Sequence, residues 1–356
     1  MYQGRGVTRA VEHVNQVLAP QLVGTPADDQ ERERLDTTLC AIDGTAKKSR
    51  LGANALLGVS GAVAVAAAHG LGLPLFRYLA KLYGGDGERS LEVPMPMVNI
   101  LSGGLHAGRQ LDVQDFLLVP IGAASYQETM AQVHRVYHAA RAELAERGLP
   151  QTLVADEGGL GPALGQNEAG LEILTRAMAR AGLEPGVTGG IALDVAATYH
   201  DGRYRWSRDG REFDSDDLIG LLAAWVDQYP IISIEDGLAE DDWAGWQALT
   251  RRMADRIQIV GDDLFTTSPG RIRQGIEQKV ANAVLIKVNQ IGTVTESLDA
   301  VRLAHDAGYR TVVSARSGET EDTFIADLAV AVGPGQIKVG SITRSERLAK
   351  YNRIPY

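Results

Sequence analysis

The sequence predicts an α/β fold, in which a β/α barrel follows a smaller, mainly helical domain. Charged residues end the short apolar runs in the second half of the chain, at Asp194, Glu235, Asp262, Lys287, Arg316 and Lys338. Successive members are 41, 27, 25, 29 and 22 positions apart, and each of the last four intervals fits one strand, one helix and two loops. Reactive groups of such a barrel lie at the carboxyl ends of its strands, around one mouth. We therefore expect these side chains to meet there.

The first part of the chain is predicted to be helical. Residues 6–22 and 54–70 have helical patterns, with helix-favouring acidic sequence between them at 28–39. No alternating strand pattern precedes Leu75. The Gly-rich stretch YGGDGE is the best boundary, so we expect domains over residues 1–88 and 89–356.

The barrel is expected to open with two successive strands, VPMPMVNI and DVQDFLLVP, joined by the loop SGGLHAGRQ. Helix 126–147, a strand that ends in ADEGG and helix 167–181 then precede the strand that ends at Asp194. The remaining helices are expected between the later apolar runs, at 215–228, 242–254, 269–278, 294–307 and 321–332. This order is a ββ opening followed by βα units.

Length, charge and cysteine content narrow the class of protein. A chain of 356 residues accommodates a barrel of about 250 residues and a smaller domain. With 45 acidic and 35 basic residues the net charge is −10, and no Lys/Arg run is long enough to follow a phosphate backbone, so we expect no nucleic-acid partner. Cys40 is the only cysteine, and the amino terminus lacks a signal-peptide pattern. A cytoplasmic enzyme is therefore expected.

Residues 51–76 contain no Asp, Glu, Lys or Arg and have the length of a membrane span. Much of their apolar content is Ala and Gly, however, and Asn54, Ser60 and His69 interrupt it. Such a segment gains little from a lipid environment. We predict a buried helix and no membrane span.

Three carboxylates on neighbouring strands predict a metal site. Asp194, Glu235 and Asp262 would converge at the barrel mouth, where bare carboxylates repel one another. An all-oxygen set without His or Cys suits Mg²⁺. Each carboxylate taken alone could equally form a strand-end salt bridge or cap a helix.

Other residues around this mouth have two interpretations each. Lys287 could be a general base or a salt-bridge partner of the carboxylates. Glu157 precedes two glycines and could project toward a substrate, or belong to an ordinary turn. Arg316 and Ser317 before a Gly turn suit an anion. His106, in a Gly-flanked loop, could contact substrate or brace the loop.

Long strings of this sequence resemble the enolase family. They include VGDDLFTT, LIKVNQIGTVTE, RSGETEDTFIADLAV and RSERLAKYN, and the similarity extends from about Tyr2 to Asn352. The resemblance implies a phosphopyruvate hydratase, a homodimeric glycolytic enzyme that uses Mg²⁺ to dehydrate 2-phosphoglycerate to phosphoenolpyruvate. A Lys or His base with one or two Mg²⁺ ions is the general pattern of this superfamily.

The resemblance also implies a role for each site residue. Lys287 would remove the proton at C2, and Lys338 would stabilise the resulting aci-carboxylate. Glu157 would assist the loss of the C3 hydroxyl as water, and Arg316 with Ser317 would hold phosphate. The implied metal ligands are Asp194, Glu235 and Asp262, and the further substrate-binding residues are His106, Gln114 and Asp115.

The sequence departs from the family pattern at several points. Met1 aligns inside the family's amino-terminal domain, after its opening strands and after the mobile Ser-containing loop that closes over the site. The similarity stops soon after Asn352. Ala315 stands where the family has His, Asp115 where it has Glu, and Gly237 where it has Pro. We expect weaker exclusion of water and weaker catalysis.

Two alternatives follow from these departures. The first is an enolase paralogue that acts on a related phosphonate or phosphorylated hydroxy acid in secondary metabolism, because Ala315 and Asp115 alter the substrate's surroundings and spare the metal set. The second is a non-catalytic enolase-like binding protein. Retention of the carboxylates together with both lysines argues against the second, because a pseudoenzyme has no need of this cluster of charge.

Overall fold

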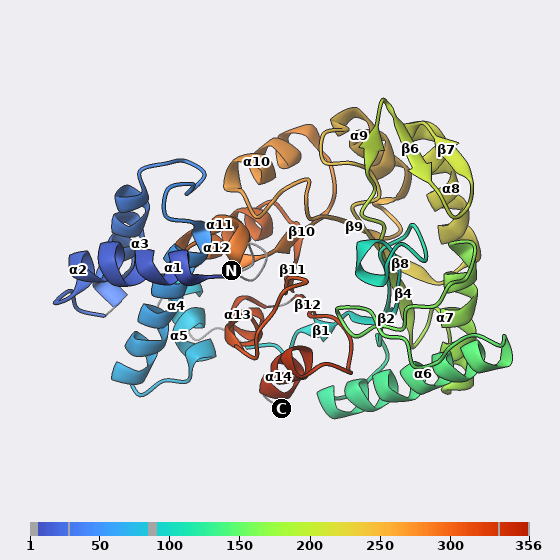
Figure 1. The fold of residues 1–356 in the computed structure, drawn as a ribbon, viewed down its shortest axis with the longest axis horizontal. Helices are drawn as coiled ribbons and strands as arrows, with labels where there is room; N and C mark the ends of the chain where they lie inside the picture. The colour runs from blue at the N-terminus through green and yellow to red at the C-terminus, as the bar shows by residue number, and fades with distance from the viewer. Residues whose placement is uncertain (1–5, 28, 85–90, 334, 355–356) are drawn as a thin grey trace.

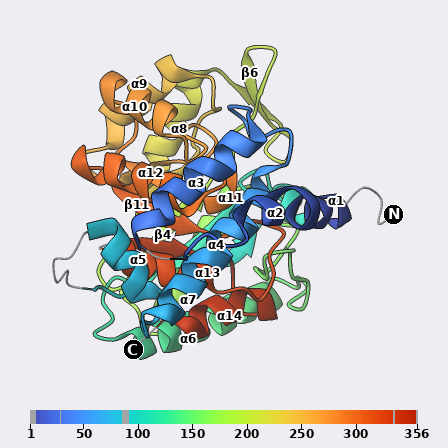
Figure 2. The ribbon, with the colours of Figure 1, turned by 90° about the vertical axis from the view of Figure 1, so that its left-hand side faces the viewer.

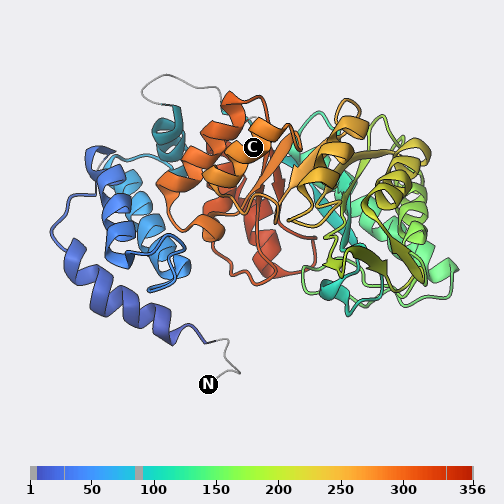
Figure 3. The same cartoon turned by 90° about the horizontal axis from the view of Figure 1, so that it is seen from above.

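The computed structural model describes residues 6–27, 29–84, 91–333 and 335–354. A helical part lies beside a β/α barrel (Figures 1 and 3). The helical part consists of α1 (Thr8–His13), a π-helical turn (Val14–Leu18), α2 (Ala19–Leu22), α3 (Asp29–Asp43), α4 (Ala53–Gly70) and α5 (Leu75–Gly84). Among the described residues the first strand begins at Met95, as the sequence predicts.

Polar side chains of the helical part accept hydrogen bonds from the barrel. Asp36 Oδ2 accepts a hydrogen bond from Thr295 N at 2.9 Å, and Ser60 Oγ accepts one from Val294 N at 2.9 Å. These amides belong to the first turn of α12 (Val294–Asp306), whose free N–H groups need acceptors. Figure 2 shows α3, α4 and α5 lying over this side of the barrel.

One sheet forms the barrel and closes on itself. Its order is β1-β12-β11-β10-β9-β8-β4-β3-β2. The strands are β1 (Met95–Pro96), β2 (Val98–Ser102), β3 (Asp115–Val119), β4 (Gly190–Asp194), β8 (Ile231–Glu235), β9 (Gln258–Gly261), β10 (Ala283–Ile286), β11 (Arg310–Ser314) and β12 (Gln336–Lys338). Met97, between β1 and β2, donates its N–H to Ile337 O at 2.8 Å and completes the ring.

Strand β3 pairs antiparallel with β2 and β4, whereas the strand pairs from β4 to β12 and on to β1 are parallel. Helices follow the strands on the outside of the barrel (Figure 1). They are α6 (Tyr126–Glu146), α7 (Glu168–Arg180), α8 (Ser215–Gln228), α9 (Trp243–Met253), α10 (Pro269–Gln278), α11 (Val288–Ile291), α12, α13 (Phe324–Val332) and α14 (Ser345–Arg353). The ββ opening and the later helices agree closely with expectation.

Alternation along each strand separates two cores. Leu285 belongs to a small buried cluster inside the barrel with Ala192 and Val260, whereas its neighbours Val284 and Ile286 join the larger cluster beneath the helices. Successive side chains of a strand point to opposite faces, so this division is what a closed barrel requires.

Two features differ from the predicted order. The strand expected to end in ADEGG does not form; Val154 makes only an isolated bridge to Leu160 and is 42% exposed. This stretch has little apolar surface to bury, so α6 and α7 follow β3 without a strand between them. A hairpin sheet of β5 (Tyr199–His200), β6 (Arg203–Trp206) and β7 (Arg211–Phe213) accounts for the longest interval, from Asp194 to Glu235.

The apolar segment forms α4, but only one face of this helix is buried. Ala55, Leu56, Ala64 and Ala67 are covered, whereas Val65 is 39% exposed. By length and composition alone α4 could cross a membrane, with 33% of it buried inside the structure. It packs against α3, α5, α11 and α12. The helix that was expected to be buried is therefore only about one-third buried.

Candidate active site

The alternation of the strands aims the predicted residues into one mouth. Asp194, Asp262 and Lys287 each follow an interior residue by two positions, since Ala192, Val260 and Leu285 lie inside the barrel. A period of two keeps these polar side chains on the interior face at the carboxyl ends of β4, β9 and β10.

A cavity of about 380 Å³ occupies this mouth. Its lining includes every residue predicted for the site except Glu235: His106, Gln114, Asp115, Glu157, Asp194, Asp262, Lys287, Arg316, Ser317 and Lys338. Glu235 is buried, 1% exposed, and touches the site through Lys338. Residues from most of the barrel's strands and loops thus meet at one place.

Each lysine of the site contacts the carboxylates. Lys338 Nζ donates to Asp194 Oδ2 at 2.6 Å and to Glu235 Oε2 at 2.7 Å, and Lys287 Nζ pairs with Asp262. Burial opposes the charged form of Lys338, but Asp194 and Glu235 outweigh it and hold its pKa well above the usual value. Burial likewise opposes the charge on Asp194, but Lys338 outweighs it and lowers the pKa of that carboxyl. Lys338 is therefore a fixed positive charge.

The carboxylate of Glu235 is incompletely compensated. Burial and the neighbouring Asp194 raise its pKa well above the ordinary range. Its Oε1 atom is buried and has no hydrogen-bond partner within the described residues. An unpaired buried acceptor is costly, and a cation beside it would supply the missing partner.

A second group of carboxylates overlaps this one. Ligand atoms of Asp236, Asp262 and Asp263 lie within 4.8 Å of one another. However, both oxygens of Asp236 already accept backbone bonds, from Asp262 N and Asp263 N at 2.9 Å each. We therefore regard Asp236 as the support of the Asp262 turn. The oxygen-only donors, with the unpaired Glu235 oxygen among them, fit a hard divalent cation such as Mg²⁺.

Another buried acid, Asp115, lies beside Asp194, because β3 pairs with β4 and these two residues are register partners. Asp115 accepts hydrogen bonds from Asn99 Nδ2 and, at 3.0 Å, from Ser102 Oγ. Burial, and then the charge of Glu157, raise the pKa of Asp115 to about 8. Gln114 Nε2 donates to Asp194 Oδ2 at 3.0 Å, which connects this side of the site to the carboxylates.

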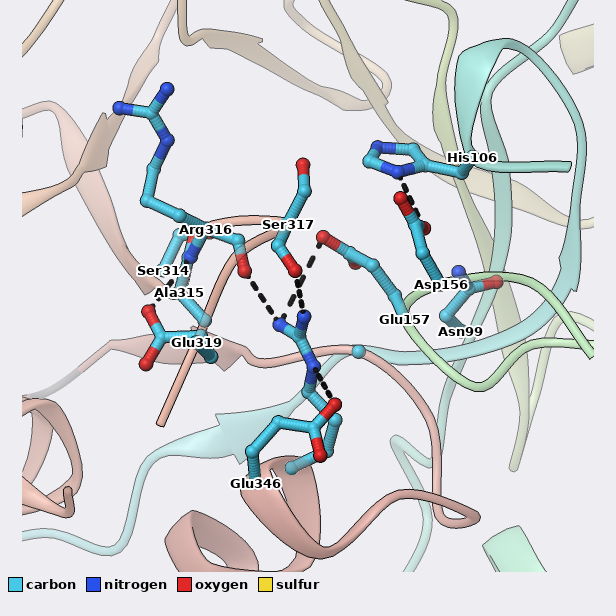
Figure 4. Close-up of polar contacts among 12 residues, drawn as sticks. Asn99, His106, Asp156, Glu157, Ser314, Ala315, Arg316, Ser317, Glu319 and Glu346 are labelled. Carbon is cyan, nitrogen blue, oxygen red and sulfur yellow. Dashed lines mark hydrogen bonds and ion pairs between the residues drawn. The ribbon is translucent and has the colours of Figure 1, made fainter. Parts of the chain in front are cut away.

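His106 is fixed by a carboxylate of the Glu157 loop. Its Nδ1 lies 2.7 Å from Asp156 Oδ1 (Figure 4). Burial lowers the pKa of this imidazole, but Asp115, Asp156 and Glu157 outweigh it, and the net pKa is raised above 6.5. His106 therefore has a brace, whereas its ring still lines the cavity.

Arg316 and Ser317 face the cavity from the loop after β11. Ala315, which lies between Ser314 and Arg316 in the sequence, is buried and lines the cavity, so its methyl group forms that part of the wall. Figure 4 shows the Arg316 guanidinium extending away from Glu157. Arg316 also lines a neighbouring cavity of about 1210 Å³, between α4 and α13. An anion could approach the guanidinium from either cavity.

Sequence reasoning missed two acids and one buried cation near the site. Asp236 and Asp263 are the second members of the acidic doublets EDG and GDD, and the doublets themselves were the available signal. Arg347, on α14, lies 3.9 Å from Glu157 Oε1 through its Nη1 atom and is 0% exposed. Its distant position in the sequence gave no indication of this contact.

The mouth thus combines the amino groups of Lys287 and Lys338 with several carboxylates. Such a set suits removal of a proton beside a carboxylate, because positive charge stabilises the anion that forms.

In comparisons with protein families, the model of the enolase C-terminal TIM barrel domain matches residues 90–355, and the model of the enolase N-terminal domain matches residues 1–79.

Proposed function

This chain belongs to the enolase family, and on that premise we propose that it dehydrates 2-phosphoglycerate to phosphoenolpyruvate, as a phosphopyruvate hydratase does. The observation that carries the proposal is the placement of Lys287 and Glu157 on one cavity with Lys338 and Arg316. A proton acceptor, an acid and two cations then surround a space of small-molecule size.

The carboxylates Asp194, Glu235 and Asp262 would hold Mg²⁺. When bound, the ion would supply positive charge to the substrate carboxylate. The unpaired Oε1 atom of Glu235 supports this assignment, because among the described residues only the other oxygen, Oε2, has a hydrogen-bond partner, Lys338.

Lys287 Nζ would accept the proton from C2, and the electrons of that C–H bond would first delocalise into the substrate carboxylate. They would form the C2–C3 double bond when the C3–O bond breaks. The buried Lys338 ammonium would stabilise the negative charge that develops on the substrate carboxylate. As the C3–O bond breaks, Glu157 would give a proton to the hydroxyl, which leaves as water. Gln114, Asp115 and His106 line the same cavity and would orient the substrate.

Arg316 and Ser317 would bind the phosphate. A guanidinium matches phosphate oxygens with two parallel hydrogen bonds, and a hydroxyl adds a third donor. The loop geometry that fixes these residues supports this role, because the backbone of both is tied to α14.

We further propose a division into residues 1–88 and 89–356, a homodimer and a cytoplasmic location. The limits of the two family matches, at residues 79 and 90, support the division.

The test is an absorbance assay of the enol product, with purified protein, 2-phosphoglycerate and Mg²⁺. We expect turnover by the wild type, its loss in Lys287→Ala, and its retention in Lys47→Ala, which removes an exposed lysine. Absence of turnover by wild-type protein that binds Mg²⁺ would overturn the proposed substrate.

One observation favours a second candidate substrate class. Ala315 presents a methyl group to the cavity, and Asp115 is held by Asn99 and Ser102. A related phosphonate or phosphorylated hydroxy acid with an apolar group at that position would fit this lining. Turnover of such a compound by protein that leaves 2-phosphoglycerate unchanged would establish it.

A further inference from the structure

We propose that Arg347 is a positioning residue that fixes the spacing between the loop of Glu157 and the loop of Arg316 and Ser317. The inference deepens the proposed function, because it concerns how the proposed acid and the proposed phosphate-binding residues are held at the distance a substrate requires. Arg347 does not itself line the cavity, so it acts through lining residues that it contacts.

The guanidinium of Arg347 bonds directly to the phosphate-side loop. Its Nη1 donates to Arg316 O at 2.7 Å and its Nη2 donates to Ser317 O at 2.6 Å (Figure 4). The planar fork of a guanidinium presents two parallel N–H groups, which suits two successive carbonyl oxygens. An ammonium group has no such geometry.

The same guanidinium reaches the opposite loop. Arg347 Nη1 lies 3.9 Å from Glu157 Oε1, and Figure 4 shows the Glu157 carboxylate directed toward this group and toward Ser317. One rigid cation therefore contacts the residue proposed to donate the proton, Glu157, and both residues proposed to bind the phosphate, Arg316 and Ser317.

The surrounding segment contacts the two loops separately. Thr343 Oγ1 donates to Gly158 O at 2.7 Å, and Arg344 Nη2 donates to Ala155 O at 3.0 Å. Lys350 Nζ donates to Thr320 O at 2.6 Å. These side chains hold one loop each, whereas the contacts of Arg347 join the two.

Close packing leaves this arrangement little freedom. Gly340 has φ +91°, and a Cβ atom there would lie 2.8 Å from Glu157 O and 3.0 Å from Arg347 Cδ. The backbone of the Glu157 loop, Gly340 and the Arg347 stem are therefore in contact. A glycine is required both for the backbone conformation and for this approach.

The burial of Arg347 favours positioning over stability alone. The side chain is 0% exposed, its Nε has no hydrogen-bond partner in the described part of the chain, and Glu346 Oε1 lies 3.6 Å from that atom. A buried ion pair adds little net stability, and replacing all of its members by apolar groups is often neutral. An apolar side chain cannot make polar contacts with two carbonyl oxygens and a carboxylate at the same time.

The test compares Arg347→Lys and Arg347→Ala with a matched control, Arg353→Lys. Arg353 is on the same helix and forms a fork with Asp327 at 2.8 and 2.9 Å, and it lines the larger cavity and not the cavity of the proposed site. The measurements are the thermal midpoint, the affinity for inorganic phosphate by calorimetry, and kcat and KM for 2-phosphoglycerate.

We expect Arg347→Lys to weaken phosphate binding about 10-fold and to lower kcat about 10- to 100-fold, because small displacements of positioned groups are costly. Arg353→Lys should change both less than about 2-fold at a similar thermal midpoint. In Arg347→Ala, millimolar guanidinium should restore phosphate affinity by refilling the position.

Wild-type phosphate affinity and kcat in Arg347→Lys would overturn the inference. So would equal losses in Arg353→Lys, or a lysine variant that does not fold, since the role would then be structural only. Weaker phosphate binding in Arg347→Lys, in a protein whose wild type leaves 2-phosphoglycerate unchanged, would overturn the proposed substrate and uphold the role of Arg347.

Discussion

Lys338 Nζ lies 2.7 Å from Glu235 Oε2, although three strands separate β12 from β8 in the sheet. The ion pair therefore spans the barrel, and the same ammonium also contacts Asp194. One cation thus neutralises two carboxylates that approach it from another part of the ring.

Replacing this cation should destabilise the fold. In Lys338→Met the carboxylates of Asp194 and Glu235 lose their shared partner while still buried, and we expect a loss of about 3–5 kcal/mol of unfolding free energy. Urea unfolding in the presence of a chelator measures this. Lys47→Met, at an exposed position, is the control. Equal midpoints for Lys338→Met and the wild type would contradict the expectation.

Mg²⁺ should stabilise the protein through Glu235 and not through Asp263. A ligand at 100 times its Kd adds about 2.7 kcal/mol, and we expect an increase of this order for the wild type. Glu235→Gln should weaken Mg²⁺ at least about 10-fold, because it removes the charge beside the unpaired oxygen. Asp263→Asn, in the overlapping carboxylate group, should have little effect. Calorimetric titration of the three proteins distinguishes the ligand set with Glu235 from the one with Asp263. A larger loss of Mg²⁺ affinity in Asp263→Asn than in Glu235→Gln would favour Asp263.

His106 should make stability depend on pH near neutrality. Its pKa is raised in the folded protein above the ordinary 6.5, because Asp115, Asp156 and Glu157 outweigh the effect of burial. The contribution is complete below the ordinary value and is lost as pH rises through the folded-state pKa. His106→Gln should therefore be less stable than the wild type at pH 6 and nearly equal at pH 9. Denaturant unfolding at pH 6 and pH 9 checks this. A difference in unfolding free energy between the two proteins that grows with pH would show that the imidazole is neutral.

Ala315→His should distinguish the two substrate hypotheses. A donor directed at developing charge contributes about 10²- to 10³-fold in rate, so an imidazole at this lining position should raise kcat for 2-phosphoglycerate if the site is a weakened hydratase. If the natural substrate places an apolar group there, the variant should instead lose affinity for it. Steady-state kinetics on both substrate classes decide this, and Ala315→Ser serves as the small polar control.

Much of the fold could be predicted from the sequence because apolar runs and charged ends recur at regular intervals. The strand ends at Asp194, Glu235 and Lys338 lie where these runs predicted them. The expected ADEGG strand is absent, because a run with exposed Leu153 and Val154 has no second apolar layer to join. Length alone could not distinguish a strand from a turn at this position.

The site was predicted less completely, for a physical reason. Asp194 and Lys287 are directed by the strand period, which is visible in the sequence. Arg347 binds mainly carbonyl oxygens, and every residue offers one of those, so no sequence pattern identifies its partners. Asp236 similarly accepts hydrogen bonds from backbone N–H groups, which no sequence pattern identifies.

The pairing of β1 with β12 constrains how the chain reaches its native state. Met95 pairs with Gln336, so the ring is complete only after segments from opposite ends of the barrel have met. Contacts between such distant residues form slowly, and an open sheet exposes strand edges that can pair with other molecules. Refolding should therefore be most prone to aggregation before β1 pairs with β12. A circular permutation that brings these two strands close in sequence should speed folding and reduce the concentration-dependent loss of protein to aggregation.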